Sequence, residues 1–279
     1  MRCLPAVTVS GSATAPILTV SNGDDFVISH DGTNLTYDLG AGAVAFGGAL
    51  GSVTSLRITC SSSSSSAGNN IQIALNRASD GLSGSFQVTV TANGGADLID
   101  ASGTDFFVSL NGGGSNDTLL GGSGNDFIDG STGNDIIIGG DGNDNLIGGS
   151  GADNISGEAG DDLCQGGDSN DSISGGDGND TINGMGGNDS LSGDGDDDEI
   201  YGGGGRDVLS GGDGDADFIK GQGGIDMIHD SWSNAVDELA NFRSRYRSTA
   251  NLDPRDMSKY TGFDEIDTSF VRTKDDFVV

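Results

Sequence analysis

Aspartates at a fixed spacing are the residues of this chain whose pattern could do chemistry. Between Gly112 and His229 the sequence divides into thirteen consecutive units, twelve of nine residues and one of ten, and each unit carries an aspartate at the same place. A row of carboxylates suits Ca²⁺, which takes six to eight oxygen ligands at about 2.3–2.6 Å. The candidate metal ligands are Asp117, Asp126, Asp135, Asp144, Asp153, Asp162, Asp171, Asp180, Asp189, Asp198, Asp207, Asp217 and Asp226.

The other places of the unit indicate how such carboxylates would be held. Most units begin with glycine and have another glycine at the fourth place, which favours a tight turn and bares main-chain carbonyl oxygens as further ligands. The residue two places after the aspartate is leucine or isoleucine in every unit except one, where Cys164 stands as a small core residue. The second half of the unit therefore predicts a very short strand with one inward residue. Two units would form one flattened coil, and coils would stack as parallel strands about 4.8 Å apart.

This pattern resembles the GGxGxDxUx consensus of the repeats-in-toxin (RTX, hemolysin-type) family. The units that start at Gly121, Gly139, Gly148, Gly175 and Gly202 match the consensus fully. The resemblance implies a parallel β-roll, an all-β solenoid in which calcium lies between the turns of neighbouring coils. Because successive units alternate between the two edges of the roll, the partner of each unit is the second one along. This geometry allows at most about eleven calcium sites.

Some turns depart from the consensus, so we expect fewer than eleven occupied sites. Asp126 and Asp144 flank the best-supported site, because their units are the only full matches that face each other across a gap. One unit carries an extra residue near Asp215 and Ala216, which would distort its loop. The irregular positions are Ser115, Ser169 and Asp196 at the fourth place and Glu158, Met185 and Gln222 at the second place.

The charge of the chain favours a cation as its partner. The formal net charge is −31, from 43 acidic and 12 basic residues. Such an imbalance argues against binding nucleic acid or an anionic membrane surface, since both require a positive surface. Stacked carboxylates at roughly 5 Å would repel by about 0.8 kcal/mol per pair even in a water-like dielectric. Calcium would reverse that interaction, so we expect folding and binding to be one event. The alternative for this segment is a flexible glycine-rich linker.

The residues before the array read as strands. Residues 1–92 form a β-rich region, and residues 93–111 look like decayed repeats that cap the first coil, because solenoids need covered ends. Within the second segment, Asp97-Leu98-Ile99 and Asp105-Phe106-Phe107 keep the aspartate-plus-apolar order. A separate small β-sandwich is the alternative for the first segment. The expected strands are Ile17–Val20, Phe26–Ile28, Leu35–Tyr37, Leu56–Thr59, Ile71–Leu75 and Phe86–Val90, and the six-serine run from Ser61 is expected to be a loop.

The residues after the array, 230–279, have a different composition and predict a short, partly helical tail. Ser231 and Trp232 are expected to cap the last coil, and Asn234–Ser248 fits a helix with arginines in its last part. The chain closes on aspartates followed by Phe277-Val278-Val279. This ending resembles the uncleaved tail of proteins exported by type I secretion systems.

The sequence contains no catalytic constellation. The HExxH, GxSxG and GxxxxGK[ST] motifs are all missing, and the only histidines are His30 and His229. No apolar stretch approaches the roughly 20 residues of a membrane-spanning helix. We therefore expect an extracellular or cell-surface calcium-binding protein with a structural or interaction role, whose partner on the cell surface or in the extracellular matrix the sequence does not name. The alternative is the calcium-stabilised part of a secreted enzyme or toxin.

Overall fold

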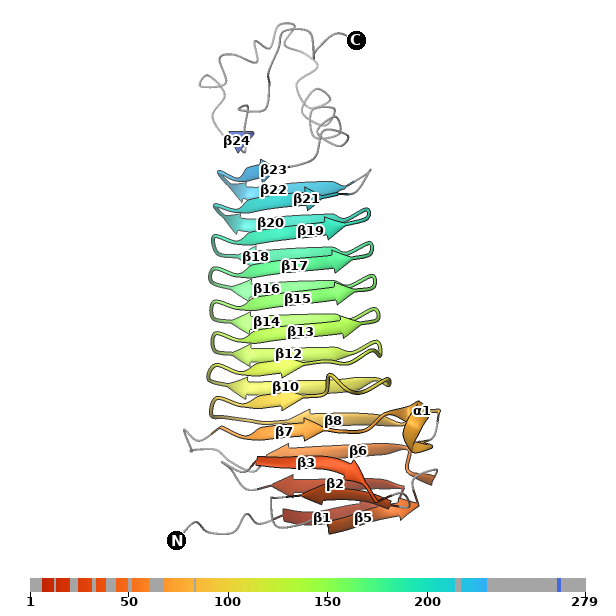
Figure 1. Cartoon of the computed structure of the whole chain (residues 1–279). Coiled ribbons are helices and arrows are strands. Elements are labelled where there is room, and N and C mark those ends of the chain that lie inside the picture. Colours follow the sequence, from red (N-terminus) through yellow and green to blue (C-terminus); the bar gives the residue numbers. More distant parts are fainter. Residues whose placement is uncertain are drawn as a thin grey trace, which may run out of the picture.

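The chain forms a column of stacked β-coils that starts at its N-terminal end (Figure 1). The structure is a computed structural model. It describes residues 7–12, 14–20, 25–31, 34–38, 44–49, 52–60, 68–82, 84–213, 217–229 and 265–266. The expected helix at Asn234–Ser248, the cap at Ser231 and Trp232, and the tail at Phe277–Val279 lie outside these residues. So do the serine run from Ser61 and the insertion near Asp215.

Two long sheets face each other across the column. One has eleven strands in the described residues, in the order β1-β2-β6-β8-β10-β12-β14-β16-β18-β20-β22. Their bounds are Val7–Ser12, Ala15–Val20, Ser55–Cys60, Gln87–Thr91, Val108–Gly114, Phe127–Thr132, Asn145–Ser150, Leu163–Asp168, Thr181–Gly186, Glu199–Gly205 and Phe218–Gly224. We call this sheet A.

The opposite sheet, sheet B, has thirteen strands in the described residues, in the order β24-β23-β21-β19-β17-β15-β13-β11-β9-β7-β3-β4-β5. Their bounds, in the same order, are Glu265–Ile266, Met227–His229, Val208–Gly212, Ser190–Gly195, Ser172–Asp177, Asn154–Ala159, Ile136–Asp141, Thr118–Leu120, Leu98–Asp100, Asn70–Ile73, Asp25–His30, Asn34–Asp38 and Val44–Ala49. Consecutive strands of the array lie in opposite sheets, and each pairs in parallel with the second strand along, as in Phe127 with Asn145. The predicted β-solenoid, its alternation and its parallel stacking are confirmed.

A column of single aliphatic side chains fills the space between the sheets. The residue two places after each aspartate is at most 5% exposed from Leu119 to Ile219. Cys164 occupies this column as expected, and burial raises the pKa of its thiol above the usual value. Eleven of the thirteen array units thus bury one leucine or isoleucine in the core, while one unit buries the smaller Cys164 and the last unit has the partly buried Ile228.

The strands are longer than the sequence predicted. We expected the glycine-rich half of the unit to be a turn, but β12 runs from Phe127 through the first three residues of the next unit to Thr132. The glycine at the first place is extended and buried, and the strand reaches the third place, so that only the fourth to sixth places of the turn lie outside the strands. Glycine is needed at the first place because this position faces the core, where a side chain would have no room.

The N-terminal region continues the same two sheets. β2, β6 and β8 stack in parallel below β10 in sheet A, and β3 and β7 lie below β9 in sheet B. The six expected strands of this region are confirmed in position, while β1, β5 and the short helix α1 (Arg77–Asp80) were not predicted. The described strands of this region therefore extend the two sheets of the solenoid, with β1, β4 and β5 added at the sheet ends by antiparallel pairing.

The two decayed repeats differ from each other. Leu98 and Ile99 pair with Thr118 and Leu119, so Asp97 stands at the aspartate place of a regular coil. Asp105 does not, because β10 pairs with β12 in a register that puts Val108 opposite Asp126. Asp105 instead accepts a hydrogen bond from the main-chain N–H of Arg77, which begins α1. In the second decayed repeat, the position that corresponds to the aspartate is therefore Val108, three residues after Asp105.

No helix in the described part of the chain is long and apolar enough to cross a membrane.

Candidate metal sites

All thirteen predicted aspartates are buried, and they form two rows along the two edges of the roll. Each is at most 6% exposed. One edge holds Asp117, Asp135, Asp153, Asp171, Asp189, Asp207 and Asp226, and the other holds Asp126, Asp144, Asp162, Asp180, Asp198 and Asp217. The structure therefore brings the predicted ligands together in two stacks, with one carboxyl group for each turn.

One oxygen of each carboxyl group links neighbouring coils. The main-chain N–H of Asp135 donates to Oδ1 of Asp153 at 2.8 Å, and that of Asp126 donates to Oδ1 of Asp144 at 2.7 Å. The same bond recurs along both edges up to Asp226 on one and Asp217 on the other, with donor–acceptor distances of 2.7 to 3.0 Å. The aspartate is therefore a structural link between coils as well as a candidate ligand.

The second oxygen of the carboxyl group has no hydrogen-bond partner in nearly every turn. It is Oδ2 of Asp117, Asp135, Asp144, Asp153, Asp162, Asp171, Asp180, Asp189, Asp198, Asp207 and Asp226. A buried charged oxygen without a partner is strongly unfavourable. Each of these carboxyl groups must therefore be protonated or have a cation beside it.

The first glycine of each unit makes room for that oxygen. A Cβ atom at Gly184 would lie 2.4 Å from Oδ2 of Asp189 and 2.6 Å from the carbonyl oxygen of Gly202. Across all thirteen units the same imaginary Cβ would lie 1.9 to 2.9 Å from the Oδ2 of its own aspartate. In eight of the thirteen units a main-chain carbonyl oxygen also lies within 3 Å of that Cβ position, and carboxylate and carbonyl oxygens are the types that Ca²⁺ binds.

Burial makes the charged form of these aspartates costly. Desolvation raises the pKa of Asp144 from 3.8 to about 8 and that of Asp117 to about 7, and neighbouring carboxyl groups add to both shifts. The pKa of Asp135 is raised to about 6, again chiefly by desolvation. Hydrogen bonds from main-chain N–H groups act in the opposite direction but are the smaller influence. Near neutral pH, a bound cation would remove this penalty.

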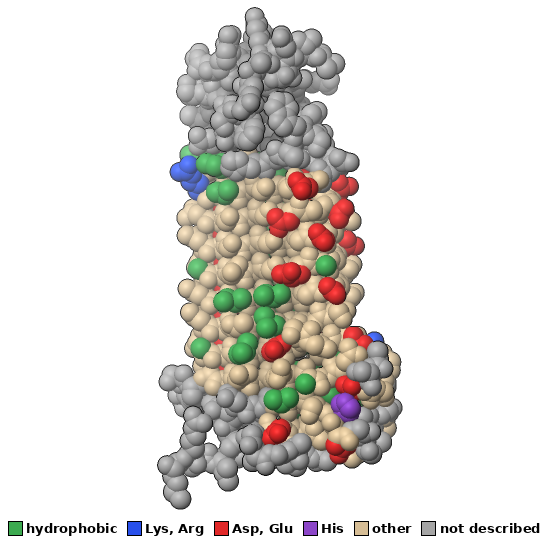
Figure 2. Space-filling model, in the orientation of Figure 1, with side chains coloured by type: hydrophobic (Ala, Val, Ile, Leu, Met, Phe, Trp, Pro, Cys, Tyr) green, Lys and Arg blue, Asp and Glu red, His purple; other side chains and the backbone are tan. Residues whose placement is uncertain are grey.

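Acidic side chains also surround the rows on the surface. On the face that Figure 2 shows, they gather along one edge, and the lysines and arginines lie only toward the two ends of the column. Among the exposed acidic residues of the array are Glu158, Asp161, Asp177, Asp194 and Asp197. This distribution attracts cations to the turns.

The irregular turns keep the backbone of the regular ones. The second and fourth places have positive φ in most turns, for example 107° at Gly149 and 128° at Gly151. Met185 has a φ of 70° and Ser115 a φ of 82°, so side chains occupy a conformation that normally favours glycine. The same holds for Glu158, Ser169, Asp196 and Gln222. These substitutions therefore strain the turn without changing its path.

The turn that the sequence favoured most is the exception. Gly122 and Gly124 lack the positive φ found at these places in the neighbouring turns. The main-chain N–H of Gly122 instead donates to Oδ2 of Asp126 at 2.9 Å. The preceding loop differs here, because its Thr104 and Phe106 pack where Cβ atoms of these glycines would stand. Asp126 thus already has a partner that Asp144 lacks.

A second ladder at the fifth place of the unit was not recognised from the sequence. Oδ1 of Asn116 accepts the main-chain N–H of Asn134 at 3.0 Å, and Oδ1 of Asn125 accepts that of Asn143 at 3.2 Å. These bonds join the same coils as the aspartate bonds but run in the opposite direction. The recurring Asn-Asp pair at the fifth and sixth places could have revealed it. The side chains that accept in this way are Asn116, Asn125, Asn134, Asn143, Asp161, Asn170, Asn179 and Asn188.

The arrangement fits calcium supported by main-chain oxygens. Within the described residues no group of three histidine, cysteine, aspartate or glutamate side chains could hold a metal ion. Each turn offers one carboxyl group together with main-chain carbonyl oxygens, and its neighbour offers the same. A cation that accepts carbonyl ligands, such as Ca²⁺, suits this donor set better than one that requires nitrogen or sulfur.

Comparison with known families agrees with this geometry. The model described as RTX calcium-binding nonapeptide repeat (4 copies) matches the chain in overlapping segments. These are residues 93–128, 109–137, 129–164, 138–173, 156–191, 165–200, 183–216 and 192–228. No curated protein and no solved structure matches the chain.

Proposed function

We propose that this chain, whose residues 93–228 match the family model of RTX calcium-binding nonapeptide repeats, is a calcium-dependent structural module that folds when it binds several calcium ions. The ions lie along both edges of the roll, between the turns of neighbouring coils. The predicted aspartates of the array supply the carboxylate ligands, and main-chain carbonyl oxygens of the turns supply the others.

The unpartnered Oδ2 atoms carry this proposal. Eleven of the thirteen array aspartates have a buried Oδ2 without a hydrogen-bond partner. Removing these oxygens from water is unfavourable unless a cation or proton compensates for it. Each array strand offers one large inward side chain, whose burial contributes about 1.5–3 kcal/mol. Against this stands a backbone entropy cost of about 1–2 kcal/mol for each ordered residue. Calcium therefore decides whether the array folds.

The site of action follows from the calcium supply. A chain that folds only with calcium stays unfolded where free calcium is low and folds where calcium is abundant, outside the cell. We therefore place the folded protein in the extracellular space or on a cell surface, where the rigid column would present its faces to a partner. A type I export route is consistent with this order of events.

Far-UV circular dichroism of the chelated full-length chain tests the proposal. Addition of calcium should produce a cooperative gain of β signal at micromolar to millimolar concentrations, and magnesium should not, because it requires a tighter octahedral shell. The matched variant Asp171→Asn keeps an acceptor for the main-chain bond but removes the charge, so it should shift the calcium midpoint upward. A chain that is fully folded in chelator contradicts folding on binding.

A further inference from the structure

The turn formed by residues 92–97 has the backbone of an array turn although its sequence departs from the consensus. Asn93 and Gly95 have φ angles of 75° and 102°, as Ser131 and Gly133 have 74° and 136° at the matching places of a turn on the same edge. A Cβ at Gly113 would lie 2.2 Å from the carbonyl oxygen of Asn93. Likewise, a Cβ at Gly149 would lie 2.3 Å from the carbonyl oxygen of Ser131.

Asp97 stands in this turn as the array aspartates stand in theirs. It is 3% exposed, and its main-chain N–H donates to Oδ1 of Asp117 at 2.7 Å, so the ladder of this edge continues to it. Its Oδ2 is buried and has no hydrogen-bond partner. The local sequence hides this equivalence, because Asp97 and Asp117 are 20 residues apart, two more than the regular spacing of 18.

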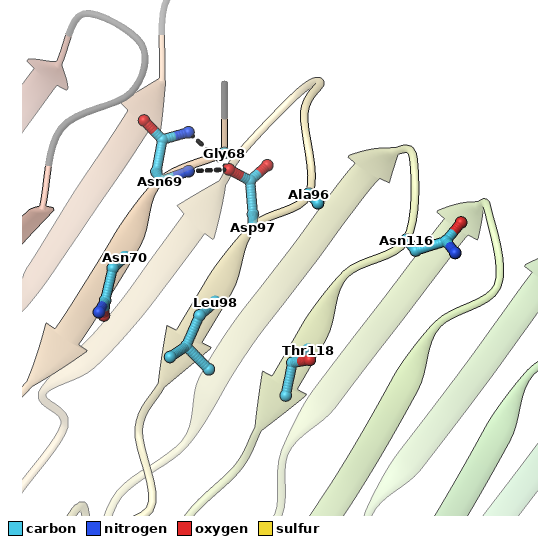
Figure 3. Close-up of a pocket in the computed structure, with 8 residues that line it drawn as sticks. All are labelled: Gly68, Asn69, Asn70, Ala96, Asp97, Leu98, Asn116 and Thr118. Carbon is cyan, nitrogen blue, oxygen red and sulfur yellow. Dashed lines mark hydrogen bonds between the residues drawn. The ribbon is translucent and has the colours of Figure 1, made fainter. Parts of the chain in front are cut away.

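The ladder stops at the next coil. Asn69 occupies the aspartate place there, and both its main-chain N–H and its Nδ2 donate to Oδ1 of Asp97, at 2.5 and 2.7 Å (Figure 3). An amide replaces the carboxylate at this point, so the row of negative charges on this edge ends at Asp97. A cavity of about 390 Å³ adjoins Asp97 and is lined by Asn69, Asn70, Asn116 and Thr118 among others. It gives a small hydrated ion access to the end of the row.

We propose that the row of calcium sites on this edge extends one coil beyond the thirteen units, to a site between the turns 92–97 and 112–117. Asp97 and Asp117 supply its carboxylate oxygens. This inference rests on the proposed calcium-binding function and adds one site to that edge.

The new site differs from the others at its first residue. Ala92 stands where every array unit has glycine, and it is fully buried. Its methyl group takes up space that the carboxylate has to itself in the other turns. The site should therefore be the weakest of its edge and the last to fill.

Counting bound calcium in the full-length chain, by native mass spectrometry with a parallel calorimetric titration, tests the proposal. An aspartate inside the row borders two gaps, so Asp153→Asn should lose the sites on both sides. If the row extends to Asp97, Asp117→Asn loses as many ions as Asp153→Asn, and Asp97→Asn loses one. If the row begins at Asp117, Asp97→Asn binds as many ions as the wild type and Asp117→Asn loses fewer than Asp153→Asn. The second pattern overturns the proposal.

A further variant gives a readout that does not depend on weakening the turn. Ala92→Gly should fill the last site at a several-fold lower calcium concentration, with no change in the number of ions. Unchanged titrations of both Ala92→Gly and Asp97→Asn overturn the proposed site but leave the calcium-binding function in place. A wild-type chain that binds no calcium overturns the function itself, so the two failures are distinguishable.

Discussion

The first coils of the column and the array coils share one architecture but obtain their stability differently. In the N-terminal coils, β6 alone buries Leu56, Ile58 and Cys60, and β8 follows a buried Phe86 that packs edge-on against Phe106 at 4.9 Å. In the array, each strand buries one aliphatic side chain and one glycine, and each turn buries a carboxyl group. The same inward positions thus carry apolar volume in one region and space for oxygen atoms in the other.

The glycine-aspartate pattern provides less stabilisation from apolar burial than the N-terminal strands do. Burying a large apolar side chain contributes about 1.5–3 kcal/mol without any ligand. An array strand has one such side chain where β6 has two and a cysteine, and its turn adds a carboxyl group that is unfavourable when charged. The N-terminal coils should therefore be stable without metal, whereas the array depends on it.

Removal of calcium should separate the two regions most strongly. Hydrogen exchange of the full-length chain should show main-chain amides of β14, β16 and β18 protected in calcium and rapidly exchanging after chelation. Amides of β6 and β8 should keep most of their protection, because their apolar core needs no ion. Equal loss of protection in both regions would contradict the idea that only the array depends on calcium. Full protection of the array in chelator would contradict it as well.

Acidification should partly replace calcium in the array. Burial raises the pKa of Asp117, Asp171 and Asp180 from 3.8 to about 7. The folded, metal-free array therefore holds more protons than the unfolded chain, so this contribution to its stability is fully present below about pH 4 and is lost as the pH rises to about 7. In calcium-free buffer the β signal should be larger at pH 5 than at pH 8.

The same protons compete with the ion. In the folded array calcium displaces them, but because they also stabilise the metal-free fold, the calcium concentration at the folding midpoint should fall as the pH drops from 8 to 6. A midpoint that does not move with pH would show that the carboxyl groups are already charged in the metal-free fold. The N-terminal coils should respond little over this range.

The sequence predicted the array well because one residue type at one spacing determined it. Each aspartate needs glycine beside it and an aliphatic residue two places later, so the pattern specified the coil, its partner and its candidate ligands together. It could not reveal the lengthened coil after Asp97, because an insertion of two residues breaks the spacing while the backbone bonds continue. Nor did it show that the main-chain N–H of Gly122 would donate a hydrogen bond to Oδ2 of Asp126, since that bond depends on the shape of the preceding loop.

The first place of a unit should tolerate no side chain, whereas the third should. Gly184→Ala would put its Cβ 2.4 Å from Oδ2 of Asp189 and displace the carboxyl group. We expect a loss of about 1–3 kcal/mol in stability and a weaker calcium response. The matched control is Gly186→Ala in the same turn, whose Cβ would meet nothing closer than 3.8 Å and whose φ is not positive. Urea unfolding in saturating calcium measures the stability of both variants. Equal urea midpoints would contradict the idea that the first-place glycine makes room for the carboxyl group.

Relief of backbone strain in the same turn should have the smallest effect and the opposite sign. Met185 has a φ of 70° and is 50% exposed, so its side chain adds strain with little burial in return. Met185→Gly should stabilise the calcium-bound array by about 1 kcal/mol, because glycine adopts this conformation freely. Met185→Ala keeps the strained Cβ and should give no comparable gain. If both variants lower the urea midpoint, contacts of the methionine side chain outweigh the backbone strain. Packing would then explain why array turns tolerate bulky residues at the second place of the unit.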